Sequence, residues 1–121
     1  MSEIAKLSIT DKIKTFEDAL KLKGLSMSYF KKYCGKRSYN IAMEKLVIIA
    51  SALNEEWTPD WKNNIQYKWY PYFKMAAPFS FSYTGCACAN SLVGSRLCFR
   101  SEELAEYAGR QFDAIYKEFY A

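Results

Sequence analysis

The chain has 121 residues, of which half are apolar and 17% are aromatic, so it can form one hydrophobic core and is too short for two. We therefore expect a single domain over residues 1–121 and exclude a disordered chain. The net charge of +4 is uneven, because residues 1–40 carry nine Lys or Arg against four Asp or Glu, and residues 41–121 carry eight against nine.

Helical signals come first along the chain. Thr15 begins a Thr-x-x-Asp pattern that can cap a helix, and Gly24 supplies a stop, so a short helix is predicted at 16–23. Ser28 is the predicted cap of a second short helix, over 28–33.

The strongest helical pattern follows Asn40. Apolar residues recur there at spacings of three and four as far as Leu53, which predicts a helix near 40–54 with one buried stripe. Asn54 is its predicted C-cap. Pro59 cannot continue a helix, so a turn-like loop should follow.

Strand signals occupy the next part of the chain. Aromatic residues are dense at 69–73 and alternate with serine at 79–83, and both segments are predicted strands. A third strand is predicted at 96–100, with residues 97 and 99 on one face and the intervening residues on the other. Ser101 should then cap a long helix near 102–119.

This order of elements predicts the α+β class. We expect a small antiparallel sheet of about three strands, an N-terminal helical part and a long C-terminal helix packed on the sheet. The helices near 40–54 and 102–119 should lie on the same face of that sheet.

Several segments together carry a resemblance; they are IKTFEDA (13–19), ALNE (52–55) with WTPDW (57–61), KWYP (68–71), and GSRLCF (94–99) followed by ELAEYAG (103–109). In them the chain resembles a group of small uncharacterised proteins encoded by phages and prophages of gut Bacteroidales, over most of residues 13–119. The resemblance implies an accessory protein of a mobile element in the bacterial cytoplasm. The group has no established activity, so the resemblance assigns no residue a role.

The start of the chain and its apolar segments bear on localisation. No stretch approaches the roughly 18 apolar residues that span a bilayer, and the first residues lack a basic-then-apolar signal sequence. We therefore expect a cytoplasmic protein with no membrane partner.

Residues that commonly support catalysis are scarce. The chain has no histidine and no glycine-rich phosphate-binding motif, so we expect no enzyme; catalysis by a thiol or by carboxylates is the weakest alternative. Cys86, Cys88 and Cys98 with Cys34 are chemically a possible zinc set. Their spacing departs from the usual pairs, so free thiols are predicted, with no metal and no cofactor.

Two groups of residues are candidates for binding a ligand. The candidates for phosphate contact are Lys31, Lys32, Lys36, Arg37, Arg96 and Arg100. The candidates for base stacking are Trp57, Trp61, Trp69 and Tyr70. Each group also has a structural interpretation. The first four cations can belong to a solvated loop, and Arg96 and Arg100 can pair with Glu102 and Glu103. The aromatic rings can cover a small core.

The sequence thus predicts a non-enzymatic phage or prophage accessory protein that binds a nucleic acid or a nucleotide, through aromatic stacking and Lys/Arg phosphate contacts. The alternative is a protein–protein interaction module, either an inhibitor of a host protein or a small structural phage component, that uses the same aromatic residues as anchors. Salt dependence distinguishes the two, because phosphate binding weakens steeply with ionic strength.

Overall fold

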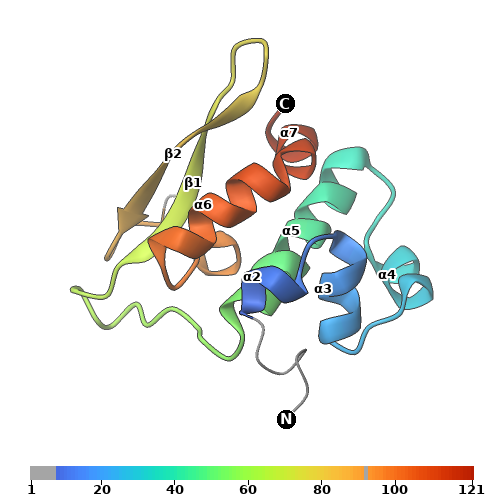
Figure 1. Cartoon of the computed structure of the whole chain (residues 1–121), viewed down its shortest axis with the longest axis horizontal. Coiled ribbons are helices and arrows are strands. Elements are labelled where there is room, and N and C mark those ends of the chain that lie inside the picture. The colour runs from blue at the N-terminus through green and yellow to red at the C-terminus, as the bar shows by residue number, and fades with distance from the viewer. Residues whose placement is uncertain (1–7, 92) are drawn as a thin grey trace.

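A computed structural model describes residues 8–91 and 93–121 of the chain (Figure 1). The N-terminal part contains helices α2 (Ile9–Lys12), α3 (Phe16–Leu22), α4 (Met27–Tyr33) and α5 (Ser38–Asn54). The rest contains strands β1 (Lys68–Lys74) and β2 (Ser80–Ala87), the 3-10 turn η1 (Ser95–Leu97), and helices α6 (Glu102–Gln111) and α7 (Asp113–Tyr120). The predicted α+β class is confirmed.

Capping side chains set the starts of α3 and α4. Thr15 Oγ1 accepts a hydrogen bond from the Asp18 amide at 3.1 Å, and Asp18 Oδ2 accepts one from the Thr15 amide at 3.0 Å, so the predicted capping box is present. Gly24, with φ +72°, follows the end of α3. The cap of α4 is Ser26 and not Ser28, because Ser26 has the extended backbone of an N-cap and accepts from the Tyr29 amide at 3.1 Å.

Helix α5 forms the centre of the core. Its buried stripe confirms the predicted helix; the residues that face inward include Ala42, Leu46, Ile49 and Leu53. Asn54 is the last helical residue, and Glu55 leaves the helix with φ 59°. Helices α3 and α7 pack against α5. Among the described residues, no helix is both long and apolar enough to cross a membrane. Residues 1–7, where a signal sequence was sought, lie outside the described residues.

Within the described residues the sheet has two strands, not three, and they form an antiparallel hairpin. The predicted strand at 96–100 is wrong: it begins within η1, and only Phe99 pairs with Trp69, through N···O distances of 2.9 and 2.7 Å. Leu97, Cys98 and Phe99 are all buried. Three consecutive buried side chains do not follow the alternating pattern of a strand with one exposed face, in agreement with the irregular path of this segment.

The C-terminal helix is divided in two at Phe112, where φ is −115° and ψ 29°. The predicted cap is confirmed, because Ser101 accepts from the Leu104 amide at 3.2 Å. Helix α6 packs on the hairpin, whereas α7 packs on α5 (Figure 1). One straight helix could not make both contacts. The expectation that the helices near 40–54 and 102–119 share a sheet face is therefore wrong, since α5 packs mainly against α3 and α7.

Helix α6 approaches the hairpin closely at Gly109. A Cβ atom at this position would lie 2.5 Å from the Phe81 ring and 2.8 Å from Cβ of Pro71. Only glycine allows this distance between the helix and both strands.

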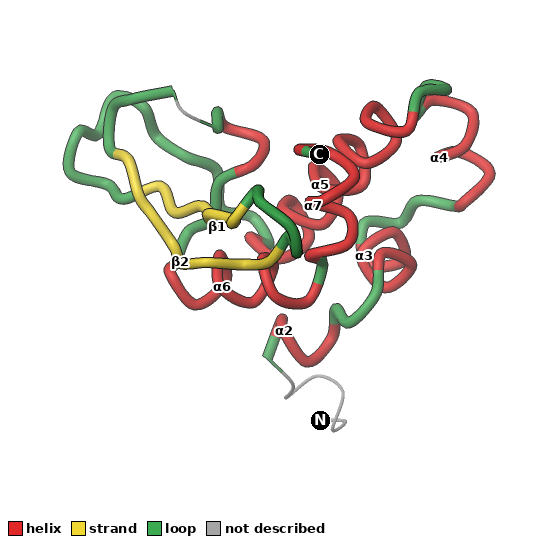
Figure 2. The backbone as a smooth tube through the Cα atoms, turned by 90° about the horizontal axis from the view of Figure 1, so that it is seen from above, coloured by secondary structure: helices red, strands yellow, loops and turns green. Residues whose placement is uncertain are grey.

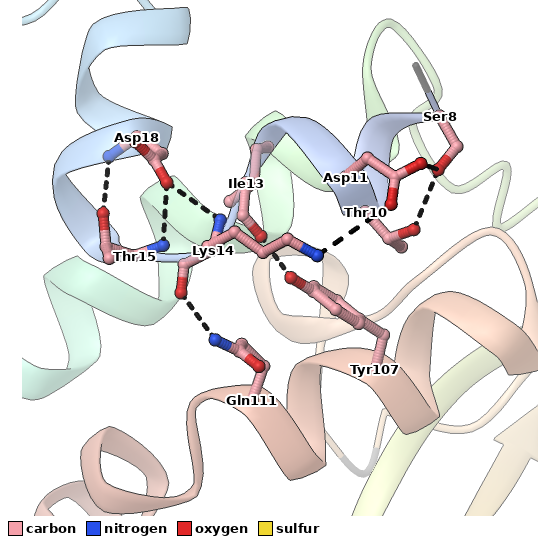
Figure 3. Close-up of polar contacts among 9 residues, drawn as sticks. All are labelled: Ser8, Thr10, Asp11, Ile13, Lys14, Thr15, Asp18, Tyr107 and Gln111. Carbon is pink, nitrogen blue, oxygen red and sulfur yellow. Dashed lines mark hydrogen bonds and ion pairs between the residues drawn. The ribbon is translucent and has the colours of Figure 1, made fainter.

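The connection between α2 and α3 is fastened to α6 (Figure 3). The Tyr107 hydroxyl donates to the Ile13 carbonyl, and Gln111 Nε2 donates to the Lys14 carbonyl at 2.7 Å. Burial raises the pKa of Tyr107 above its ordinary value of 10.0. These contacts fix the start of α3. Because residues 23–26 join α3 directly to α4, they also help to position α4.

Candidate nucleic-acid interface

Seven exposed side chains lie on α4, on the segment that leads into α5 and in the first turn of α5. We call this set the α4 surface; its members are Tyr29, Lys31, Lys32, Tyr33, Lys36, Arg37 and Tyr39. The four cations were predicted from the sequence. Tyr33 stands among them in the sequence as an interleaved aromatic residue. Tyr29 and Tyr39 were not predicted, although Tyr29 precedes Tyr33 by four residues, the spacing of neighbours on a helix surface.

The periodicity of α4 separates its two faces. Phe30 and Cys34 are buried, and the Phe30 ring meets the Phe16 ring edge-on at 4.8 Å between centroids. Side chains about half a turn away from these point outward. The sequence therefore anchors α4 through one face and leaves the other free to contact a ligand.

The tyrosines present large exposed rings. Tyr29 is 52% exposed and Tyr33 is 61% exposed, and their ring centroids lie 4.7 Å apart at an interplanar angle of 48°. Lys32 Nζ lies 5.4 Å from the centroid of the Tyr33 ring. Tyr39, in the first turn of α5, is 46% exposed. Neighbouring aromatic rings at this exposure are typical of interaction surfaces.

The charge around these rings has one sign. Residues 19–43 contain six Lys or Arg and no Asp or Glu. The ion pairs found within residues 8–91 and 93–121 are Lys14 with Asp11, Arg100 with Glu55 and Arg110 with Glu106. None of them includes a cation of the α4 surface. These ammonium and guanidinium groups can therefore contact an anionic ligand without first breaking an internal pair.

The predicted aromatic residues lie elsewhere. Trp69 and Tyr70 belong to β1, and Figures 1 and 2 place α4 and the hairpin at opposite ends of the molecule. The structure thus does not bring the Lys and Arg residues of α4 together with Trp69 and Tyr70.

The rings of this second group are engaged with the protein itself. Trp61 is half-buried and donates from Nε1 to Ser95 Oγ at 2.5 Å. Trp69 is half-buried against the core. Tyr70 is 4% exposed, with its hydroxyl 3.2 Å from that of Tyr72, and burial raises its pKa. These contacts favour the interpretation that the rings cover the core.

Lys68 is a buried lysine whose position was not predicted from the sequence. It is 1% exposed, and its Nζ donates to the carbonyls of Asn63 at 3.0 Å and Cys88 at 2.8 Å. The same ammonium lies 4.9 Å from the centroid of the Trp61 ring. The sequence contained one signal for this burial: in a strand with a period of two residues, Lys68 lies on the same face as the aromatic Tyr70.

The two later arginines have different environments. Arg100 Nη1 donates to the Asn54 carbonyl at 2.7 Å and pairs with Glu55 Oε2 at 3.2 Å. Its predicted pairing with Glu102 or Glu103 is therefore wrong, because the side chain turns toward the end of α5.

Arg96 is exposed, and the structure brings it beside Trp57, which is half-buried. Both line a pocket of about 440 Å³ together with residues from the end of α5; the other lining residues are Val47, Ser51, Asn54, Thr58, Pro59 and Ser95. Here the structure puts a predicted cation, Arg96, and a predicted stacking ring, Trp57, in a common pocket.

A second pocket, of about 390 Å³, lies at the hairpin end of the molecule. It has no charged residue in its wall; the lining residues are Tyr70, Pro71, Tyr72, Phe73, Met75, Val93 and Tyr120. Its chemistry suits an apolar partner and not a phosphate group.

The cysteines are separated in the structure. Cys34 and Cys98 are buried, Cys86 is exposed and Cys88 is half-buried, and all four are free thiols. In the part of the chain that the structure describes, no three His, Cys, Asp or Glu residues are grouped as metal ligands. Burial raises the pKa of the Cys98 thiol to about 11, so this thiol is protonated and unreactive at neutral pH.

No protein-family model matches the chain, and it matches neither a curated protein nor a solved structure. Its function is therefore inferred from its own surface chemistry.

Proposed function

We propose that the protein binds nucleic acid through the α4 surface and catalyses no reaction. The observation that carries this proposal is the set of four exposed cations, in a segment without a carboxylate, beside three exposed tyrosines. Lys and Arg contact the phosphates and supply most of the affinity, while the tyrosine rings and hydroxyls contact sugars or bases. In the setting that the resemblance implies, the ligand belongs to a bacterial cell that carries a mobile element.

A protein partner is the second candidate. It is favoured by the uncharged pocket at the hairpin end, where Tyr72 and Met75 are 38% and 53% exposed. Exposed aromatic and methionine side chains are common anchors of protein interfaces. Most of its lining residues belong to β1, and Figures 1 and 2 place the hairpin at the opposite end of the molecule from α4, so the two candidates can be tested separately.

The test is an equilibrium titration of labelled nucleic acids at about 50 mM and about 200 mM salt. The probes are a mixed-sequence single strand, the corresponding duplex and a cyclic mononucleotide. We expect a Kd tighter than about 10⁻⁴ M at the lower salt for at least one nucleic acid, with a steep loss of affinity at the higher salt. Lys31→Ala and Lys36→Ala should each reduce the slope of log K against log salt by about one.

Lys62→Ala is the matched control. It removes the same charge from an exposed lysine in the loop between α5 and β1, so the slope should remain that of the wild type. Absence of binding to every probe at the lower salt would refute the proposal. So would a control variant that weakens binding as much as the α4 variants do.

A further inference from the structure

The turn that joins α3 to α4 indicates which kind of nucleic acid the α4 surface binds. Helices α3 and α4 are joined by only four residues, 23–26, and this turn contains Gly24 with φ +72°. Short turns of this kind, often with a glycine, join the two helices of DNA-binding units in which the second helix enters the major groove. Here the second helix carries Lys31 and Lys32, both exposed, and Lys36 and Arg37 follow it.

From this arrangement we infer that the α4 surface recognises duplex DNA, with α4 lying in the major groove. The inference rests on the proposed function and narrows it from nucleic acid to duplex. Helix α4 lies at one extremity of the molecule, so its outer face can enter a groove without a clash from the hairpin (Figures 1 and 2). An α-helix about 10–12 Å in diameter matches a major groove about 12 Å wide.

The outer face of α4 carries groups that can contact base edges. Lys32 lies opposite the buried Phe30 and Cys34, with Ser28 and Tyr29 on either side of it, and all three are exposed. The two hydroxyls and the ammonium can donate to N7 and O6 of guanine, which are exposed in the major groove. A helix of seven residues is about 10 Å long, so it covers about three base pairs.

The remaining cations flank this face. Lys31 lies at its border, and Lys36 and Arg37 follow in the segment between α4 and α5. In a groove-bound helix, side chains at these positions meet the phosphates on either side. Base contacts and phosphate contacts are thus assigned to different residues, which makes the inference testable residue by residue.

A single strand fits this surface less well. The rings of Tyr29 and Tyr33 contact each other at 4.7 Å between centroids and are tilted by 48°, so they leave no slot for a base between them. Binding of single strands usually uses successive stacking platforms along a groove. Helix α4 is instead a convex element held by its own cap and by the Phe16 and Phe30 contact.

The experiment measures affinity for a set of guanine-containing duplexes and for their separated strands, with the full chain at about 50 mM salt. We expect the best duplex to bind at least about tenfold more tightly than either strand. Methylation of its guanines at N7, a major-groove atom, should weaken binding by about tenfold. Lys32→Ala should lower affinity for the best duplex by about tenfold and reduce the differences among duplexes. Lys36→Ala should weaken all duplexes alike, and Lys62→Ala should change nothing.

Each other outcome has a separate meaning. Equal or tighter binding of single strands overturns this inference and leaves the proposed function intact. Duplex binding that is insensitive to N7 methylation places the contact outside the major groove and also overturns it. Absence of binding to duplex and strands refutes both proposals. Ser28→Ala serves as a second variant of the base-contacting face beside Lys32→Ala. Both residues are exposed, so neither substitution should disturb the fold, and circular dichroism verifies that each variant is folded.

Discussion

Two of the lysine and aromatic pairs in the described part of the chain have similar geometry and opposite environments. Lys68 Nζ lies 4.9 Å from the Trp61 ring centroid, and Lys32 Nζ lies 5.4 Å from that of Tyr33. Lys68 is 1% exposed, with two backbone carbonyls as acceptors, whereas Lys32 and Tyr33 are exposed on α4. The difference teaches that a cation beside a ring indicates a binding site only where both groups remain free.

The surroundings of Lys68 explain why it can be buried. Removing an ammonium group from water is costly unless hydrogen bonds replace those that water made. The carbonyls of Asn63 and Cys88 supply two such bonds, and the face of Trp61 covers the charge. Lys68 therefore joins the segment before β1 to the segment after β2, which is a structural role.

The largest expected effect comes from Lys68→Ala. It removes a buried side chain and leaves two carbonyls without their donor, so the free energy of unfolding should fall by about 3 kcal/mol. Lys68→Met, which keeps most of the stem, should cost less. Denaturant titration measures both. Lys32→Ala should stay within about 0.5 kcal/mol of the wild type, and a larger loss there would remove the contrast between the pairs.

A smaller effect should distinguish the two rings. Trp61→Phe keeps an aromatic face for Lys68 but loses the hydrogen bond from Nε1 to Ser95, so we expect a loss of about 1 kcal/mol. Tyr33→Phe removes only a hydroxyl from an exposed ring and should change stability by less than about 0.5 kcal/mol. Thermal unfolding of the two variants side by side is the measurement. Equal losses of stability in the two variants would show that exposure does not distinguish a ring with a structural role from a ring that is free to bind a ligand.

The smallest effect concerns pH and the start of α3, the helix that supports α4. Hydrogen bonds from the Lys14 and Thr15 amides hold the pKa of Asp18 below its usual value of 3.8. A lowered pKa in the folded state means that the contribution of Asp18 is present above pH 3.8 and is lost as the pH falls through the folded pKa. Asp18→Asn should flatten the decline of stability in that acid range. A variant with an unchanged pH profile would exclude this role.

Local signals in the sequence predicted the parts of the fold that depend on local chemistry. The capping box at Thr15, the apolar spacing of α5 and the cap at Ser101 all involve residues within one or two turns of one another. Such features need no knowledge of what packs against them. The same holds for the cations of the α4 surface, which were evident as a cluster in sequence.

The features that were missed depend on distant partners. Phe112 interrupts the last helix so that α6 can contact the hairpin while α7 contacts α5. Arg100 turns to Asn54 and Glu55, which are 46 and 45 residues away along the chain. The burial of Lys68 likewise requires the carbonyl of Cys88, 20 residues later. No periodicity within a short window contains such information.

The bonds from Tyr107 and Gln111 to the carbonyls of Ile13 and Lys14 have a consequence for biosynthesis. They close loops of 94 and 97 residues, so most of the chain must emerge from the ribosome before they can form. Helices α3 and α4 are translated before α6, yet their connection to α6 is completed only after Gln111 has been translated. A nascent chain therefore acquires its finished α4 surface only once residues 107–111 have left the ribosome.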